Sequence, residues 1–189
     1  MKVIITGHTN GIGLALANEL ASRGHEIIGF SLANKNDISD PLIRDKILLH
    51  LNDADVFINN VYYPKVQTEL LERALAFWEG RQKLIVNLGS KSIYADVIPL
   101  AMKDYVADKK QQNTLIENRK LKATPQVMNL ILGLVDTSMS KALDGKKLNP
   151  ADLAKFVCDA IELKDQMYIQ NLTVDVPYQN WTDIRHKSL

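Results

Sequence analysis

Three side chains in the middle of the chain have the types and spacing for acid–base chemistry. Tyr105 and Lys109 are four residues apart, so on a helix they point to the same place. A lysine ammonium about 4 Å from a phenol favours the phenolate by about 4 kcal/mol at an effective dielectric constant near 20, before desolvation is counted. Ser90 follows an apolar run, and at a strand end its hydroxyl can hydrogen-bond a substrate oxygen that gains charge. We interpret Tyr105 as the acid and base, Lys109 as the group that tunes it, and Ser90 as the oxyanion partner.

A glycine cluster near the start of the chain has the spacing for a phosphate site. Residues 6–13 read Thr-Gly-His-Thr-Asn-Gly-Ile-Gly and lie between an apolar run and an amphipathic segment. Glycines let the backbone turn tightly and approach a pyrophosphate, and a helix N-terminus behind them offers free N–H groups and partial positive charge. Glycines also serve in ordinary turns, but a position directly after the first strand predicts a dinucleotide site.

These motifs and three others resemble the short-chain dehydrogenase/reductase family over nearly the whole chain. The glycine loop has the family's Thr-Gly-x-x-x-Gly-x-Gly spacing, and Asn59-Asn60 matches the asparagine pair that closes a strand. Residues 86–90 resemble the strand that ends in the active-site serine, 105–109 fit Tyr-x-x-x-Lys, and 132–137 resemble the loop after a later strand. Each motif alone has an ordinary structural explanation, such as a surface tyrosine or a turn serine. The ordered set is what indicates the family.

The resemblance implies an abbreviated enzyme of the compact, non-extended branch. Such an oxidoreductase transfers a hydride between NAD(P)H and a carbonyl or alcohol, with Tyr105 as acid and base beside Ser90 and Lys109. In the resemblance Lys109 also binds the nicotinamide ribose and Thr137 steadies the nicotinamide side. The predicted cofactor-binding residues are Gly7, Thr9, Asn10, Gly11, Ile12, Gly13, Ser31, Lys35, Asp37, Ile38, Asn60, Val61, Tyr105, Lys109 and Thr137. Nothing in the sequence identifies the substrate.

The sequence also departs from the family pattern. Val61 and Tyr62 stand where Ala and Gly are usual. The helix normally placed before the adenine-contacting pair, here Asp37 and Ile38, is missing, and the asparagine of the catalytic tetrad has no clear counterpart. Two hypotheses stay open: a minimal enzyme with an open site, or a non-catalytic NADP(H)-binding sensor or scaffold module. A nucleotide-sugar epimerase of the extended branch is disfavoured by the glycine spacing and the short C-terminal region.

The residues after the second strand bear on the choice of cofactor. An acidic residue there would bind the ribose hydroxyls of NAD and repel a 2′-phosphate. Ser31 occupies the region instead, with Lys35 close behind, so NADP is preferred over NAD. Three tyrosines beyond strand ends either line a substrate pocket or are half-buried packing residues, and the sequence favours neither: Tyr62, Tyr63 and Tyr94.

Short apolar runs alternate with longer amphipathic segments along the chain. The runs predict strands over 3–5, 26–30, 56–58, 84–88, 127–132 and 168–174. Helical spacing and capping residues predict helices over 11–23, 41–51, 68–78, 99–121 and 150–163. Continuous apolar strands separated by helices are typical of a parallel sheet covered on both faces. We therefore expect a single Rossmann-type α/β domain over 1–189, a doubly wound sheet in three layers.

The composition is that of an ordinary globular protein. Of 189 residues 46% are hydrophobic and 24% charged, and the formal net charge is +1, which gives no electrostatic reason to expect nucleic acid or an anionic membrane as a partner. One cysteine cannot form a disulfide framework, and the four histidines lack metal-ligand spacing, so we expect no metal. With no signal peptide or membrane-length run, a cytoplasmic location is the default. The helix over 68–78 has apolar residues on more than one side, which predicts a homodimer or homotetramer.

Overall fold

The computed structural model describes residues 1–119 and 124–177 and contains one sheet of six parallel strands. The strands are β1 (Lys2–Thr6), β2 (Glu26–Phe30), β3 (Val56–Asn59), β4 (Leu84–Leu88), β5 (Gln126–Leu132) and β6 (Asn171–Val174). The helices are α1 (Gly11–Ser22), α2 (Pro41–Leu51), α3 (Val66–Phe77), α4 (Lys103–Glu117) and α5 (Pro150–Glu162). The predicted Rossmann-type α/β fold is confirmed.

The strand order is β2-β1-β3-β4-β5-β6. It is the doubly wound order in which the chain turns back at the first strand, but with no strand outside β2 among the described residues. After β2 the chain makes only the short 3-10 turn η1 (Leu32–Asn34) before α2 begins. This confirms the missing helix that the sequence predicted and leaves β2 at the edge of the sheet.

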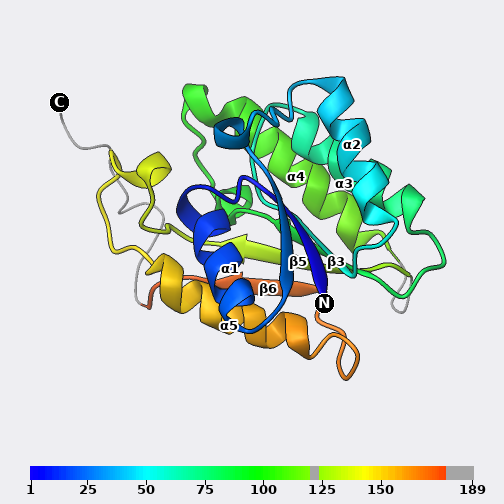
Figure 1. Cartoon of the computed structure of the whole chain (residues 1–189). Helices are drawn as coiled ribbons and strands as arrows, with labels where there is room; N and C mark the ends of the chain where they lie inside the picture. Colours follow the sequence, from blue (N-terminus) through cyan, green and yellow to red (C-terminus); the bar gives the residue numbers. More distant parts are fainter. Residues whose placement is uncertain (120–123, 178–189) are drawn as a thin grey trace.

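Helices cover the two faces of the sheet in separate groups (Figure 1). On one face α1 and α5 pack against each other and bury Leu16, Leu20 and Val157 against the strands. On the other face α2, α3 and α4 bury side chains that include Ile47 and Leu70. Each strand in the centre is therefore buried on both sides, which explains why its sequence is a continuous apolar run.

Local signals fixed most helix starts. Asn10, Asp40 and Asn149 each accept a backbone N–H at the start of α1, α2 and α5. Proline at the first position of α2 and of α5 costs no intrahelical hydrogen bond.

Two predicted elements differ from the structure by more than two residues at an end. The helix predicted over 99–121 divides into the 3-10 turn η3 (Leu100–Met102) and α4, and residues 120–121 lie outside the described part of the chain. The strand predicted from 168 begins only at Asn171, where pairing with Asn129 of β5 starts.

Candidate functional site

The glycine loop connects β1 to α1 at the carboxyl edge of the sheet. Gly7 and Gly11 have positive φ angles of 72° and 53°, a conformation that strongly favours glycine. A Cβ on Gly13 would lie 2.2 Å from the carbonyl oxygen of Gly7, so the third glycine is needed for the loop to close on itself. The Asn10 side chain accepts the N–H of Gly11, while the N–H groups of Ile12 and Gly13 have no intrahelical acceptor.

Residues from two other strand ends support this loop. The Asn60 amide donates to the carbonyl oxygens of Thr6 and Gly7 at 2.8 and 3.4 Å, and the N–H of Val61 donates to the Thr6 hydroxyl at 3.2 Å. A Cβ on Gly11 would lie 3.2 Å from the Thr137 methyl group, so the loop after β5 reaches the same place. The structure thus brings together the predicted residues of the glycine loop, Asn60, Val61 and Thr137.

An open groove of about 720 Å³ lies beside the glycine loop. Asn10 and Gly11 line it together with residues along α1 as far as Ser22, with residues 136–138 after β5 and with the start of α5. The N–H groups of Ile12 and Gly13, which have no intrahelical acceptor, and the glycines of the turn fit a pyrophosphate. The helix start favours its negative charge, and the glycines allow close backbone contact.

The end of β2 is arranged differently from the sequence-based expectation. The Ser31 hydroxyl, which is buried, donates to the Asn34 side chain at 3.2 Å, so it is already engaged within η1. Lys35 is exposed in the left-handed conformation with φ of 58°. Asp37 accepts the N–H of Ser39, and Ile38 is buried in the core of the α2 and α3 face. No acidic side chain follows β2 directly, but the Ser31 hydroxyl, predicted to bind the cofactor, is hydrogen-bonded to Asn34 within η1.

Ser90 and Tyr105 meet at the carboxyl end of β4. Ser90 precedes the 3-10 turn η2 (Lys91–Tyr94), and its hydroxyl lies 2.8 Å from that of Ser92. Tyr105 lies in the first turn of α4. Burial raises the pKa of Tyr105, and a hydrogen bond with the Ser90 side chain lowers it in part.

Lys109 is buried on the inner side of Tyr105. Its Nζ donates to Gln67 Oε1 at 2.6 Å and to the Leu88 carbonyl at 2.5 Å, and it lies 5.5 Å from the centre of the Tyr105 ring. Burial lowers the pKa of Lys109 to about 7, while the nearby charge of Asp108 raises it. The expectation that the Lys109 ammonium brings the Tyr105 pKa down is not met, because burial acts on both groups against their charged forms.

Tyr62 occupies the space next to Tyr105. The two rings are in edge contact with centroids 4.8 Å apart, and the Tyr62 hydroxyl donates to Asp108 at 3.2 Å. Burial, followed by the charge of Asp108, raises the pKa of Tyr62 to about 12. Tyr62 is thus a packing residue of the site, whereas Tyr63 and Tyr94 are 47% and 58% exposed at its edge.

Sequence reasoning missed two residues of this centre. Gln67 on α3 contacts Lys109 directly, and Asp108 on α4 accepts the backbone N–H of Lys65 at 2.9 Å, at the start of α3. Asp108 is one of the variable positions of the Tyr-x-x-x-Lys motif over 105–109, so the motif indicates no role for it. Gln67 carried no signal in the sequence, because nothing there indicates that α3 faces Lys109.

The predicted cofactor site and the Ser90–Tyr105–Lys109 cluster lie along one edge of the sheet. Among the described residues, no group of three or more His, Cys, Asp or Glu side chains is arranged to hold a metal ion. No helix in 1–119 or 124–177 has the length and apolar character needed to cross a membrane.

Comparisons with known proteins identify solved structures of similar fold. No family model and no curated protein matches the chain. A short-chain dehydrogenase from Burkholderia cenocepacia in complex with NADP is 17% identical, with 93% of this chain and 88% of that one covered and a TM-score of 0.73. An alcohol dehydrogenase from the archaeon Thermococcus sibiricus is 20% identical, with 95% and 97% covered and a TM-score of 0.72.

The similarity extends along the whole chain. A serine dehydrogenase from Escherichia coli is 17% identical, with 96% of this chain and 100% of that one covered and a TM-score of 0.70. The protein therefore has the fold of the short-chain dehydrogenases/reductases.

Proposed function

We propose that the protein is an NAD(P)-dependent oxidoreductase that transfers a hydride between a nicotinamide cofactor and a carbonyl or alcohol. The observation that carries the proposal is the contact of Ser90 with Tyr105 and the position of Lys109 behind them, at the sheet edge that also holds the glycine loop. These crystallised neighbours are described as dehydrogenases, in complex with NADP, NADH or 5-hydroxy-NADP. We also propose that residues 1–189 form one domain and that the protein is located in the cytoplasm.

The cofactor would lie along the carboxyl edge of the sheet and supply the hydride when bound. The N–H groups at the start of α1 bind its pyrophosphate, and Asn60, Val61 and Thr137 hold the loop around it. NADP is the preferred form, because no carboxylate follows β2 to repel a 2′-phosphate and Lys35 is exposed nearby. Lys109 has a third N–H as an ammonium, beyond the two given to Gln67 and Leu88, and this N–H serves the nicotinamide ribose.

Tyr105 moves the proton. In carbonyl reduction its hydroxyl donates a proton to the substrate oxygen, and in alcohol oxidation the phenolate accepts one. The Ser90 hydroxyl hydrogen-bonds the same oxygen as negative charge develops on it. Because the pKa of Tyr105 lies above its ordinary value, the phenol is protonated at neutral pH, which is the form that donates a proton in carbonyl reduction.

A non-catalytic NADP(H)-binding sensor or scaffold is the second candidate. It is favoured by Tyr62, whose ring packs on Tyr105 where the resemblance calls for glycine, and by the engagement of Lys109 with two neutral carbonyls. In such a module the cofactor binds, but the phenol has no role in turnover.

The substitution Tyr105→Phe separates the two candidates. It removes only the hydroxyl, so in an enzyme the affinity for NADPH is retained while carbonyl reduction falls by about 10²–10⁴-fold. The measurement is NADPH oxidation with a panel of aldehydes, ketones and quinones, together with NADPH titration by fluorescence. Tyr168→Phe is the matched control, because Tyr168 is a partly buried tyrosine in the segment before β6.

The outcomes of this test differ clearly. Undiminished activity in Tyr105→Phe would overturn the assigned mechanism. NADPH binding without reduction of any compound by the wild type, and without an effect of Tyr105→Phe, is the result expected of a sensor.

A further inference from the structure

A row of asparagine side chains crosses the sheet beneath the candidate site. Asn59, Asn87, Asn129 and Asn171 occupy the same register position on β3, β4, β5 and β6. Each amide donates to the next one along the row, at 3.1, 3.1 and 3.3 Å. The first three side chains are buried, so this row is a polar layer inside an otherwise apolar core. The amide nitrogen of each of the first three has defined acceptors, which fix how the side chain is oriented, while Asn59 Oδ1 is buried without a hydrogen-bond partner.

The amide row fixes the position of Gln67, which is fully buried on α3. The Asn59 side chain donates to the Gln67 backbone carbonyl at 2.9 Å. Gln67 Nε2 in turn donates to the backbone carbonyls of Asn59 and Leu88 at 2.8 and 3.2 Å. A reversed amide would place Oε1 against these two carbonyls, so the oxygen must face the opposite way, toward Lys109.

Gln67 and Leu88 offer Lys109 two acceptors at fixed positions. The Nζ distances are 2.6 Å to Gln67 Oε1 and 2.5 Å to the Leu88 carbonyl. On its remaining side Nζ faces the rings of Tyr62 and Tyr105, with ring centres at 5.7 and 5.5 Å.

We propose that Gln67 is the positioning residue of Lys109. The two hydrogen bonds from Lys109 Nζ to Gln67 and Leu88 hold the amine in one orientation. Its third position is then directed to Tyr105 and the cofactor. This inference rests on the proposed cofactor function. Two neutral acceptors, an amide oxygen and a backbone carbonyl, orient the buried lysine. The Gln67 oxygen holds Lys109 without the strong charge pairing that a carboxylate would add, so the amine remains able to change its protonation state.

The titratable groups that face Lys109 are few. From α4 they are Tyr105 and Asp108, and from the segment after β3 the group is Tyr62. Asp108 is itself bonded to the Tyr62 hydroxyl and to the N–H of Lys65. The partners contributed by α3 and β4 are an amide and a backbone carbonyl, and both are neutral.

Two substitutions of Gln67 test the proposal in opposite directions. Gln67→Met keeps the size but removes the acceptor, whereas Gln67→Glu keeps an acceptor and adds charge. The first readout is the titration of the Lys109 side chain followed by NMR in the cofactor-free protein. We expect the acid dissociation constant of Lys109 to rise at least threefold in Gln67→Met and to fall at least tenfold in Gln67→Glu. The second readout is the dissociation constant for NADPH, which we expect to rise about tenfold in Gln67→Met.

Gln112→Met is the control for loss of a buried amide. Gln112 donates to Thr68 at 3.1 Å and reaches Gln67 Oε1 only at 3.5 Å, without touching Lys109 in the described contacts. It should lower thermal stability as Gln67→Met does, but leave the Lys109 titration and NADPH affinity within about twofold.

The proposal is overturned if Lys109 titrates as in the wild type in both Gln67 variants, or if Gln112→Met has the same effect. If Gln67→Met does not fold, the Gln67→Glu titration decides alone. If the wild type does not bind NADPH, the proposed function fails, yet the cofactor-free titration of Lys109 still tests the role of Gln67.

Discussion

Two opposing influences act on the Tyr105 hydroxyl. Burial disfavours the phenolate and raises the pKa, and the Ser90 hydrogen bond stabilises the phenolate and lowers the pKa. Burial is the larger influence, so the pKa of Tyr105 lies above its ordinary value. Ser90 is therefore important for the pH range of the site as well as for contact with a substrate oxygen.

Removal of the Ser90 hydroxyl should move the pH dependence of alcohol oxidation. Without the hydrogen bond the pKa of Tyr105 rises further, so the phenolate forms only at higher pH. We expect the rising limb of kcat/KM against pH to shift upward by roughly one pH unit in Ser90→Ala. Ser90→Thr keeps a hydroxyl and should restore the profile. A limb that stays in place, or moves to lower pH, contradicts the assigned role of Ser90.

At the scale of the element, the start of α1 combines helix capping with the predicted phosphate site. Asn10 caps the helix through Gly11, and its side chain lies at the mouth of the groove beside Thr137 and Ser138. The same residue therefore stabilises α1 and borders the place where the pyrophosphate is expected. A substitution that preserves the first role and opposes the second separates them.

Asn10→Asp is such a substitution. Aspartate caps a helix as well as asparagine and interacts favourably with the helix dipole, so thermal stability should be unchanged or slightly higher. Its carboxylate repels a pyrophosphate, and we expect the dissociation constant for NADPH to rise at least tenfold. Asn149→Asp makes the same change at the cap of α5 and should leave NADPH affinity unchanged. Equal affinity in the wild type and Asn10→Asp would contradict the loop assignment.

At the scale of the whole molecule, the apolar residues of α3 from which self-association was predicted are mostly buried within the chain. Four of the apolar residues that suggested a second exposed face are fully buried within the chain: Leu70, Leu71, Ala74 and Trp78. The Trp78 ring nitrogen also donates to the Leu51 carbonyl at 3.0 Å, which ties the end of α3 to that of α2. The exposed side of α4 includes the charged residues Lys103, Asp104 and Lys110.

A homodimer or homotetramer stays a prediction, and its interface would have to form on a surface other than α3. Leu42 and Leu49 on α2 are 73% and 69% exposed and lie two helical turns apart. Sedimentation velocity over a range of concentrations should show a species of twice or four times the 21.2 kDa chain, and the double substitution Leu42→Lys and Leu49→Lys should return it to the monomer. A single species near 21.2 kDa at high concentration would contradict self-association.

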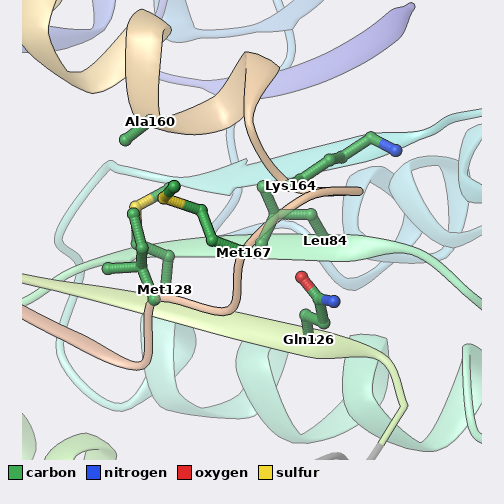
Figure 2. Close-up of a pocket in the computed structure, with 7 residues that line it drawn as sticks. Leu84, Gln126, Met128, Ala160, Lys164 and Met167 are labelled. Carbon is green, nitrogen blue, oxygen red and sulfur yellow. The ribbon is translucent and has the colours of Figure 1, made fainter.

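A small cavity lies at the amino ends of β4 and β5, at the edge of the sheet opposite the candidate site. It lies between the start of β4, the start of β5 and the segment after α5, with Leu84, Gln126 and Met167 around it (Figure 2). Its volume of about 10 Å³ is close to that of a single water site. The cavity is far smaller than the groove beside the glycine loop.

The sequence by itself determined the elements, their order and the residues at strand ends. Apolar runs and capping residues act over a few neighbouring positions, so the strands over 26–30 and 84–88 and the helix over 41–51 were predicted with their observed bounds. The glycine loop and Ser90, Tyr105 and Lys109 were found because their motifs are short and ordered along the chain.

Only the tertiary structure decided which groups surround these residues. The Lys109–Gln67 contact joins positions 42 residues apart, and the asparagine row depends on the register of four separate strands. Periodicity shows which side of a helix is buried but not what it is buried against, since that depends on how α3 and α4 pack over the sheet. The same packing partly buries Tyr105 and fully buries Lys109, and it thereby sets the direction of both pKa changes.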